Sequence, residues 1–169
     1  MNDLGPTVHG LGEVALKIGL AALLAGIAGA ERERGGHWAG LRTHMLIAVG
    51  SALLTHISIN FGATYHGGSN AWDPARISAE IVSGIGFLGA GTIIQARGRV
   101  HGLTTAAGLW VAAAIGIAVG ARFYWEAALT AVALLAILAG LRPLEKRFLR
   151  KREKSLESEG DDRQEEREP

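Results

Sequence analysis

Apolar residues are concentrated in five segments within the first 141 positions, and most polar residues fall between these segments. A helix rises about 1.5 Å per residue, so an apolar helix of about twenty residues matches the depth of a bilayer's hydrocarbon core. The first segment is the least regular, because Glu13 and Lys17 interrupt its beginning. The pattern predicts an all-α membrane bundle of five transmembrane helices, at about residues 11–30, 45–64, 77–96, 103–121 and 123–141.

The chain changes character after Leu141. Residues 142–169 are mostly Lys, Arg, Asp and Glu. We expect two parts, a transmembrane domain over residues 1–141 and a charged cytoplasmic tail over residues 142–169. The basic half of the tail suits a helix lying on the membrane surface, and the acidic half is too polar to bury a core.

Basic residues indicate the orientation, because cytoplasmic connections of membrane proteins are enriched in Lys and Arg. Arg32, Arg34 and Arg42 follow the first segment, and Arg97 and Arg99 follow the third. Seven more basic residues follow the fifth segment. With five spans all three connections lie on one side, so we expect an outside N-terminus and a cytoplasmic C-terminus.

The amino-acid composition excludes several kinds of functional site. The chain of 169 residues has no cysteine, which excludes disulfides, thiolate catalysis and cysteine-based zinc sites. Its net charge of +1 says nothing about nucleic acid, because the charges are not spread over one surface, and we expect no nucleic-acid partner. No phosphate-binding Gly-x-x-x-x-Gly-Lys motif occurs. No histidine pair has a zinc-binding spacing, and His56, in the middle of a span, is expected to bond to a neighbouring helix. We therefore expect no cofactor and no enzymatic activity.

Small residues suggest how the helices pack, because they allow close approach of helices in lipid. The fourth segment carries such residues at strict four-residue spacing, and we favour packing within the bundle over a dimer face for them: Gly108, Ala112, Gly116 and Gly120. The third segment has a similar stripe at Ala79, Ser83, Gly86 and Ala90. It also holds a dense glycine run, which indicates either a tightly packed helix, the reading we favour, or one locally unwound around a site: Gly84, Gly86, Gly89 and Gly91.

A polar cluster marks the start of the third segment. Asp73 precedes a proline, as at a capped helix start, and Asp73, Arg76 and Glu80 share one helix face, with Ser83 following. The cluster is either a capped helix start in which an arginine bridges two acids, or a functional polar site at the outer mouth of the span. Ionisable groups inside a span are costly, which favours function. Asp73 and Glu80 carry oxygen ligands suited to Mg²⁺, although more carboxylates would be needed, so a metal site stays open.

A second charged motif ends the first span, and it alternates acids and bases: Glu31, Arg32, Glu33 and Arg34. We expect ion pairs at the membrane interface here, with Arg42 contacting phospholipid and Thr43 capping the second span. Ser83 superficially resembles the nucleophile of an intramembrane protease. That chemistry needs a histidine base within reach, and no histidine occurs after His101, so this third class is the least favoured.

Four motifs together closely resemble the membrane domain of the MgtC/SapB family. They are Gly29-Ala-Glu-Arg-Glu-Arg, Gly40-Leu-Arg-Thr-His, the run from Asp73 to Gly91, and Gly102-Leu-Thr-Thr-Ala-Ala-Gly-Leu-Trp. The resemblance covers about residues 12–140 and implies a multi-pass protein of the bacterial inner membrane. It carries over the motif residues Glu31, Arg32, Glu33, Arg42, Asp73, Arg76, Ser83 and Thr104. Glu80 stands where many relatives have glutamine, and the short tail replaces the cytoplasmic ligand-binding domain of many members.

The resemblance also implies a role. The family is associated with growth at low magnesium, acid resistance and survival in host cells, and modulation of membrane proteins, including the F-type ATP synthase, is proposed for some members. We therefore expect a non-enzymatic modulator that contacts the lipid bilayer, other copies of itself and other membrane proteins. The alternative is an oligomeric transporter of Mg²⁺, protons or other cations, with Asp73 and Glu80 at its mouth.

Overall fold

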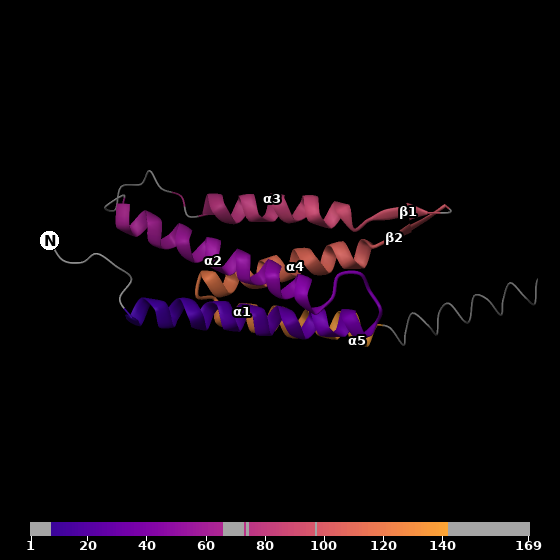
Figure 1. Ribbon diagram of the computed structural model, residues 1–169, viewed down its shortest axis with the longest axis horizontal. Helices are drawn as coiled ribbons and strands as arrows, with labels where there is room; N and C mark the ends of the chain where they lie inside the picture. The colour runs from indigo at the N-terminus through magenta and orange to yellow at the C-terminus, as the bar shows by residue number, and fades with distance from the viewer. Residues whose placement is uncertain (1–7, 66–72, 74, 97, 142–169) are drawn as a thin grey trace, which may run out of the picture. The chain divides into compact units, whose positions relative to one another are not determined.

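Helices dominate the part of the chain that the computed structural model describes, which is residues 8–65, 73, 75–96 and 98–141. Within these residues the chain forms, in order, α1 (Val8–Arg34), α2 (Leu41–Tyr65), α3 (Ala75–Gly91), β1 (Ile94–Ala96), β2 (Arg99–His101), α4 (Leu103–Gly120) and α5 (Tyr124–Gly140) (Figure 1). The chain divides into two units, Met1–Leu135 and Ala136–Pro169. The predicted tail over residues 142–169 lies outside the described residues.

Three of these helices are long and apolar enough to cross a membrane: Gly10–Arg34, Leu41–Phe61 and Leu103–Gly120. The fifth helix is apolar but shorter. The chain is therefore a helical membrane protein, the class that the sequence predicts.

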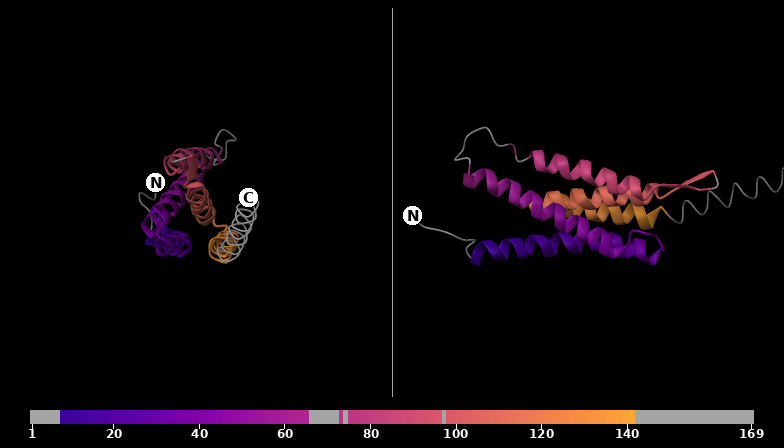
Figure 2. Two further views of the ribbon diagram at one scale, coloured as in Figure 1. Left: turned by 90° about the vertical axis from the view of Figure 1, so that its right-hand side faces the viewer. Right: turned by 45° about the horizontal axis from the view of Figure 1, so that its top comes forward.

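The core of the first unit is the contact of α2 with α1 on one side and α4 on the other (Figures 1 and 2). Small residues make the α2–α4 contact close. A Cβ added at Gly116 would meet the backbone of Ala48, and one added at Gly120 would meet the backbone of Ala52. Because Gly116 and Gly120 have no side chain, the backbones of α2 and α4 approach closely. The stripe of small residues along α4 therefore lies inside the bundle.

The third apolar segment differs from its predicted bounds. Its helix ends at Gly91 rather than Ala96, because Ile94–Ala96 pairs as an antiparallel strand with Arg99–His101. Gly102 follows the second strand of this hairpin and has a φ of 91°. A Cβ at this position would collide with the carbonyl of Thr92. A glycine is therefore required where the hairpin joins α4.

The start of α2 also differs from expectation. The helix begins at Leu41, so Thr43 lies inside its first turn and does not cap it. The Leu41 N–H donates instead to Oε2 of Glu33, at 2.8 Å. A carboxylate from the end of α1 thus stabilises the N-terminus of α2, where the helix dipole favours negative charge.

Candidate functional site

Helix α3 is held on one side only. Its buried residues are Ile81, Ile85 and Gly89, which lie one turn apart on one face. Ile81 and Ile85 cluster with Ala113 of α4, and a Cβ added at Gly89 would lie 3.5 Å from Ala106. The remainder of α3 is largely exposed, so this helix covers one edge of α4 and leaves a broad face without a neighbour among the described residues.

The predicted polar cluster lies on that unpartnered face. At 100° per residue, Arg76 and Ser83 lie on the side of α3 opposite Ile85, with Glu80 beside them. We name this surface the α3 outward face, and its members are all exposed: Arg76, Ala79, Glu80, Ser83, Gly86, Phe87 and Ala90. Phe87 is 81% exposed. The structure therefore directs Arg76, Glu80 and Ser83 away from the bundle.

The two charged residues of this face, Arg76 and Glu80, do not form an ion pair with each other within the described residues. Asp73 caps α3, since its Oδ1 accepts the Ala75 N–H at 2.8 Å. Within the described part of the chain, Arg76 forms no ion pair with Asp73 or Glu80, so the arginine bridge that one of the two alternatives includes is absent there. Ile81 packs beside Ala113, halfway along α4, which places the neighbouring Glu80 well inside the length of that helix.

The glycine run of α3 has little packing within the described bundle. A Cβ added at Gly84, Gly86 or Gly91 would meet no atom within 4 Å, and only Gly89 faces another helix closely. The helix is nevertheless continuous from Ala75 to Gly91. Of the two interpretations of the glycine run, close packing against another helix is therefore found only at Gly89 among the described residues. The continuous helix shows no local unwinding.

A groove of about 550 Å³ runs between α2 and α3. Its lining is apolar apart from Ser51 and Glu80, and Glu80 is the one ionisable residue among those that line it. Gly50 and Gly84 lie on opposite walls, and neither has a neighbour that a Cβ would touch. Glu80 therefore borders both the groove and the α3 outward face.

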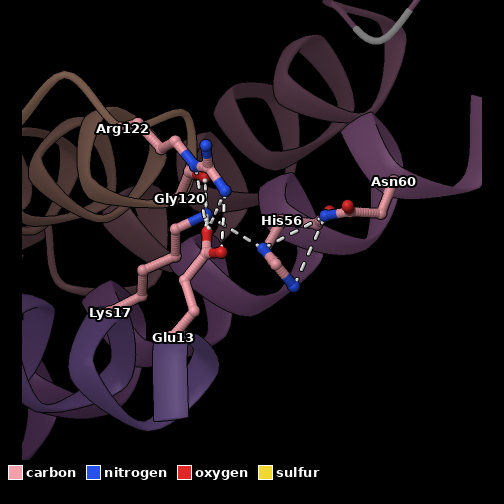
Figure 3. A network of polar contacts seen from close by, with 6 residues as sticks. All are labelled: Glu13, Lys17, His56, Asn60, Gly120 and Arg122. Carbon is pink, nitrogen blue, oxygen red and sulfur yellow. Dashed lines mark hydrogen bonds and ion pairs between the residues drawn. The ribbon is translucent and has the colours of Figure 1, made fainter. Parts of the chain in front are cut away.

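A polar network that the sequence did not predict joins α1, α2 and the end of α4 (Figure 3). Lys17, 3% exposed, forms an ion pair with Glu13 at 2.8 Å and donates to the carbonyl of Gly120 at 3.1 Å. Its Nζ also lies 3.0 Å from Nδ1 of His56, so His56 bonds to a neighbouring helix as expected. Arg122 holds both oxygens of Glu13 at 2.7 Å.

Another polar contact lies near the α1–α2 connection. Arg32, 4% exposed, donates from Nη2 to Oγ1 of Thr105 at 3.1 Å, which ties the end of α1 to the first turn of α4. A cavity of about 440 Å³ adjoins this contact and is lined by the α1–α2 connection, the hairpin and Thr105. Arg34, Glu33 and Arg42 are exposed at the same end.

No set of three or more metal-ligating side chains (His, Asp or Glu) is brought together within residues 8–65, 73, 75–96 and 98–141. Asp73 is engaged as the α3 cap, and Glu80 lies two turns further along. These two carboxylates therefore do not form a preorganised magnesium site by themselves.

Comparison with known proteins gives one consistent family. Residues 18–147 match the sequence profile of the MgtC family. An Escherichia coli (strain K12) protein named "Putative magnesium transporter YhiD" is 40% identical over 140 residues, covering 82% of this chain and 65% of that protein. Protein SapB of Bacillus subtilis (strain 168) is 45% identical over 119 residues, covering 68% of this chain and 50% of that protein.

Protein MgtC of Brucella abortus (strain 2308) is 46% identical over 124 residues, covering 73% of this chain and 49% of that protein. The chain thus spans about half to two thirds of the length of these relatives. No solved structure gives a significant match.

Proposed function

Because the chain belongs to the MgtC family, we propose that it is a non-enzymatic protein of the bacterial inner membrane that modulates other membrane proteins by binding them. The name of one relative, the Escherichia coli protein, refers to magnesium transport. By the same resemblance, the role is adaptation to low magnesium, acid or host stress, and the F-type ATP synthase is a candidate partner. The α3 outward face would make the contact.

The position of Arg76, Glu80 and Ser83 is the observation that supports this proposal. All three are exposed on α3, which packs along α4. Arg76 is the second residue of α3, whereas Glu80 and Ser83 lie further along it, where lipid would otherwise surround them. Ionisable groups facing hydrocarbon cost several kcal/mol, so they mark contacts with protein or water. Coverage of this face by protein would remove that cost.

Purification in native lipid tests the proposal. We expect the tagged chain, extracted with its surrounding bilayer by an amphipathic polymer, to carry another membrane protein in fixed ratio. Ser83→Trp should lose that protein, because the larger ring occupies the α3 outward face. Leu23→Trp, at an exposed position of α1, is the matched control and should keep it. Recovery of the native chain with lipid and no companion protein would count against the proposal.

A transporter of Mg²⁺ or other cations is the second candidate, and Glu80 beside the α2–α3 groove favours it. Five helices are few for a transporter monomer, so conduction would need an oligomer. Magnesium flux into liposomes should be absent if the chain is a modulator. Flux with the native chain that disappears in Glu80→Ala would support transport instead.

We also propose five spans, with α3 and α5 crossing the membrane, the N-terminus outside and the C-terminus cytoplasmic. The α1–α2 connection and the β1–β2 hairpin lie at the same end of the bundle (Figure 1). Arg34 ends α1 and Arg42 lies in the first turn of α2, so both flank the connection, and Arg99 begins β2. This arrangement supports a cytoplasmic position for both segments.

A further inference from the structure

We infer that His56 is a pH-sensitive contact between α1 and α2: protonation of its ring breaks the bond to Lys17 and releases the C-terminal end of α2, residues 57–65, from α1. The inference concerns the polar network of Figure 3 and not the α3 outward face, so it goes beyond the proposed function. In the proposed topology this network lies at the outer end of the bundle, so the ring would respond to the pH on the outer side of the membrane.

The geometry requires a neutral ring at His56. Lys17 pairs with Glu13 and is therefore an ammonium group, which has three N–H donors and no acceptor. Its three partners are Oε1 of Glu13 at 2.8 Å, the carbonyl of Gly120 at 3.1 Å and Nδ1 of His56 at 3.0 Å. Nδ1 must therefore accept this hydrogen bond, and only an imidazole without a proton on Nδ1 can do so.

Protonation of the ring removes this acceptor and adds a cation. The charged groups that face the ring are Glu13 and Lys17 from α1 and Arg122 from the turn after α4. From α2 itself, the neutral amide of Asn60 lies beside the ring. One anion thus already faces two cations, and a protonated His56 would be the third, which raises the net charge of the network from +1 to +2. Because two donors would then face each other, the contact between Lys17 and His56 cannot persist.

Most of the C-terminal end of α2 is exposed, so the contact of His56 matters for its position. One turn before His56, the backbone of Ala52 lies against Gly120 of α4 and fixes α2 at that level. Four of the five residues 57–61 are exposed. A cavity of about 550 Å³ adjoins this end and is lined by residues of all helices from α2 to α5. Without its polar contact to α1, the end of α2 beyond Ala52 therefore has room to move.

Protons can reach the ring from the solvent. His56 is partly exposed, and the side chains of Arg122 and Glu13 beside it are 66% and 31% exposed. Histidine is the side chain whose charge ordinarily changes between about pH 5 and pH 8. Arg122 also has a φ of 69°, a backbone conformation that costs free energy for a residue other than glycine and recurs at switch regions.

Distances between spin labels test this movement, and the absence of native cysteine allows labels at chosen pairs of sites. The first pair, Leu11→Cys and Ile59→Cys, spans the outer ends of α1 and α2 at exposed positions. The control pair, Leu23→Cys and Leu46→Cys, spans the opposite halves of the same two helices, also at exposed positions. In discs of native lipid, lowering the pH from about 8 to about 5 should increase severalfold the population with a long distance in the first pair. The distance in the control pair should not change.

His56→Gln is the matched variant, because its side-chain oxygen can accept from Lys17 at either pH and does not titrate in this range. It should abolish the response to acid while keeping the native distances of both pairs at about pH 8, which shows that it folds. An unchanged first pair in the native chain would overturn the inference. So would an equal response in His56→Gln, which retains Glu13, or the same movement in both label pairs, which would indicate a general loosening of the bundle in acid.

Discussion

Lys17 carries a charge inside an apolar helix and is nearly inaccessible, yet each of its neighbours suits an ammonium group. Glu13 supplies a negative charge, the carbonyl of Gly120 at the C-terminus of α4 accepts a hydrogen bond from Lys17, and His56 presents a ring nitrogen. A cation at a helix C-terminus also interacts favourably with the helix dipole. This single side chain therefore joins three helices, and its removal should be felt throughout the bundle.

We predict that Lys17→Met lowers the stability of the purified protein by about 1–3 kcal/mol, because the Gly120 carbonyl loses its buried donor and Glu13 one of its two cations. Thermal unfolding in detergent micelles would show a lower midpoint. Leu16→Met changes the adjacent, 64% exposed position and should leave the midpoint nearly unchanged. Equal midpoints for the two variants would show that the network does not stabilise the fold.

Residue types identified Glu13 and Lys17 as unusual in a span, but not their partners. Their spacing of four residues is compatible with the ion pair that the structure shows, but it was not part of the prediction. The contacts of Lys17 with His56 and Gly120 depend on how α1 is aligned with α2 and α4, which a local pattern does not encode. Likewise, the burial of Arg32 against Thr105 could not be read from a charged run that suggested interfacial ion pairs.

At the scale of elements, the α2–α4 contact depends on residues without side chains. We predict that Gly116→Ala destabilises the protein by about 1–3 kcal/mol, because its Cβ would press on the Ala48 backbone and Ser51. Gly19→Ala on α1 is the matched control, since nothing lies within 4 Å of its added Cβ. It should be neutral or stabilising, as alanine favours helix more than glycine. Unfolding midpoints in the opposite order would contradict this packing.

The helices were predictable because apolar length decides them, and the observed bounds of α4 and α5 differ from the predicted ones by one residue at one or both ends. The third helix was predicted too long, since Ile93 and Ile94 extend an apolar run even though the chain there turns into a hairpin. The glycines at positions 98 and 102 were the sequence signal for a turn in this region, and both residues have a positive φ in the structure. The outward direction of Arg76 and Glu80 needed the structure, because shared helix faces do not reveal which face is buried.

At the scale of the whole molecule, the proposed topology predicts the side on which each connection lies. A reporter that is active only in the cytoplasm should be active when inserted after Gly36 or fused after Leu141, because basic residues adjoin both points. Insertion between Tyr65 and Asp73 should give a reporter active only in the periplasm. Cytoplasmic activity at all three points would rule out five spans with this orientation.

The central claim is that protein, rather than lipid, covers the α3 outward face in the membrane. A spin label on Ser83→Cys, read in native membranes, measures this directly through its collision rate with dissolved oxygen, which partitions into lipid. The expected result is a collision rate several-fold lower than for the same label on Leu23→Cys, whose position on α1 is exposed. Equal collision rates at the two positions would show that lipid bathes the α3 outward face and would contradict the claim.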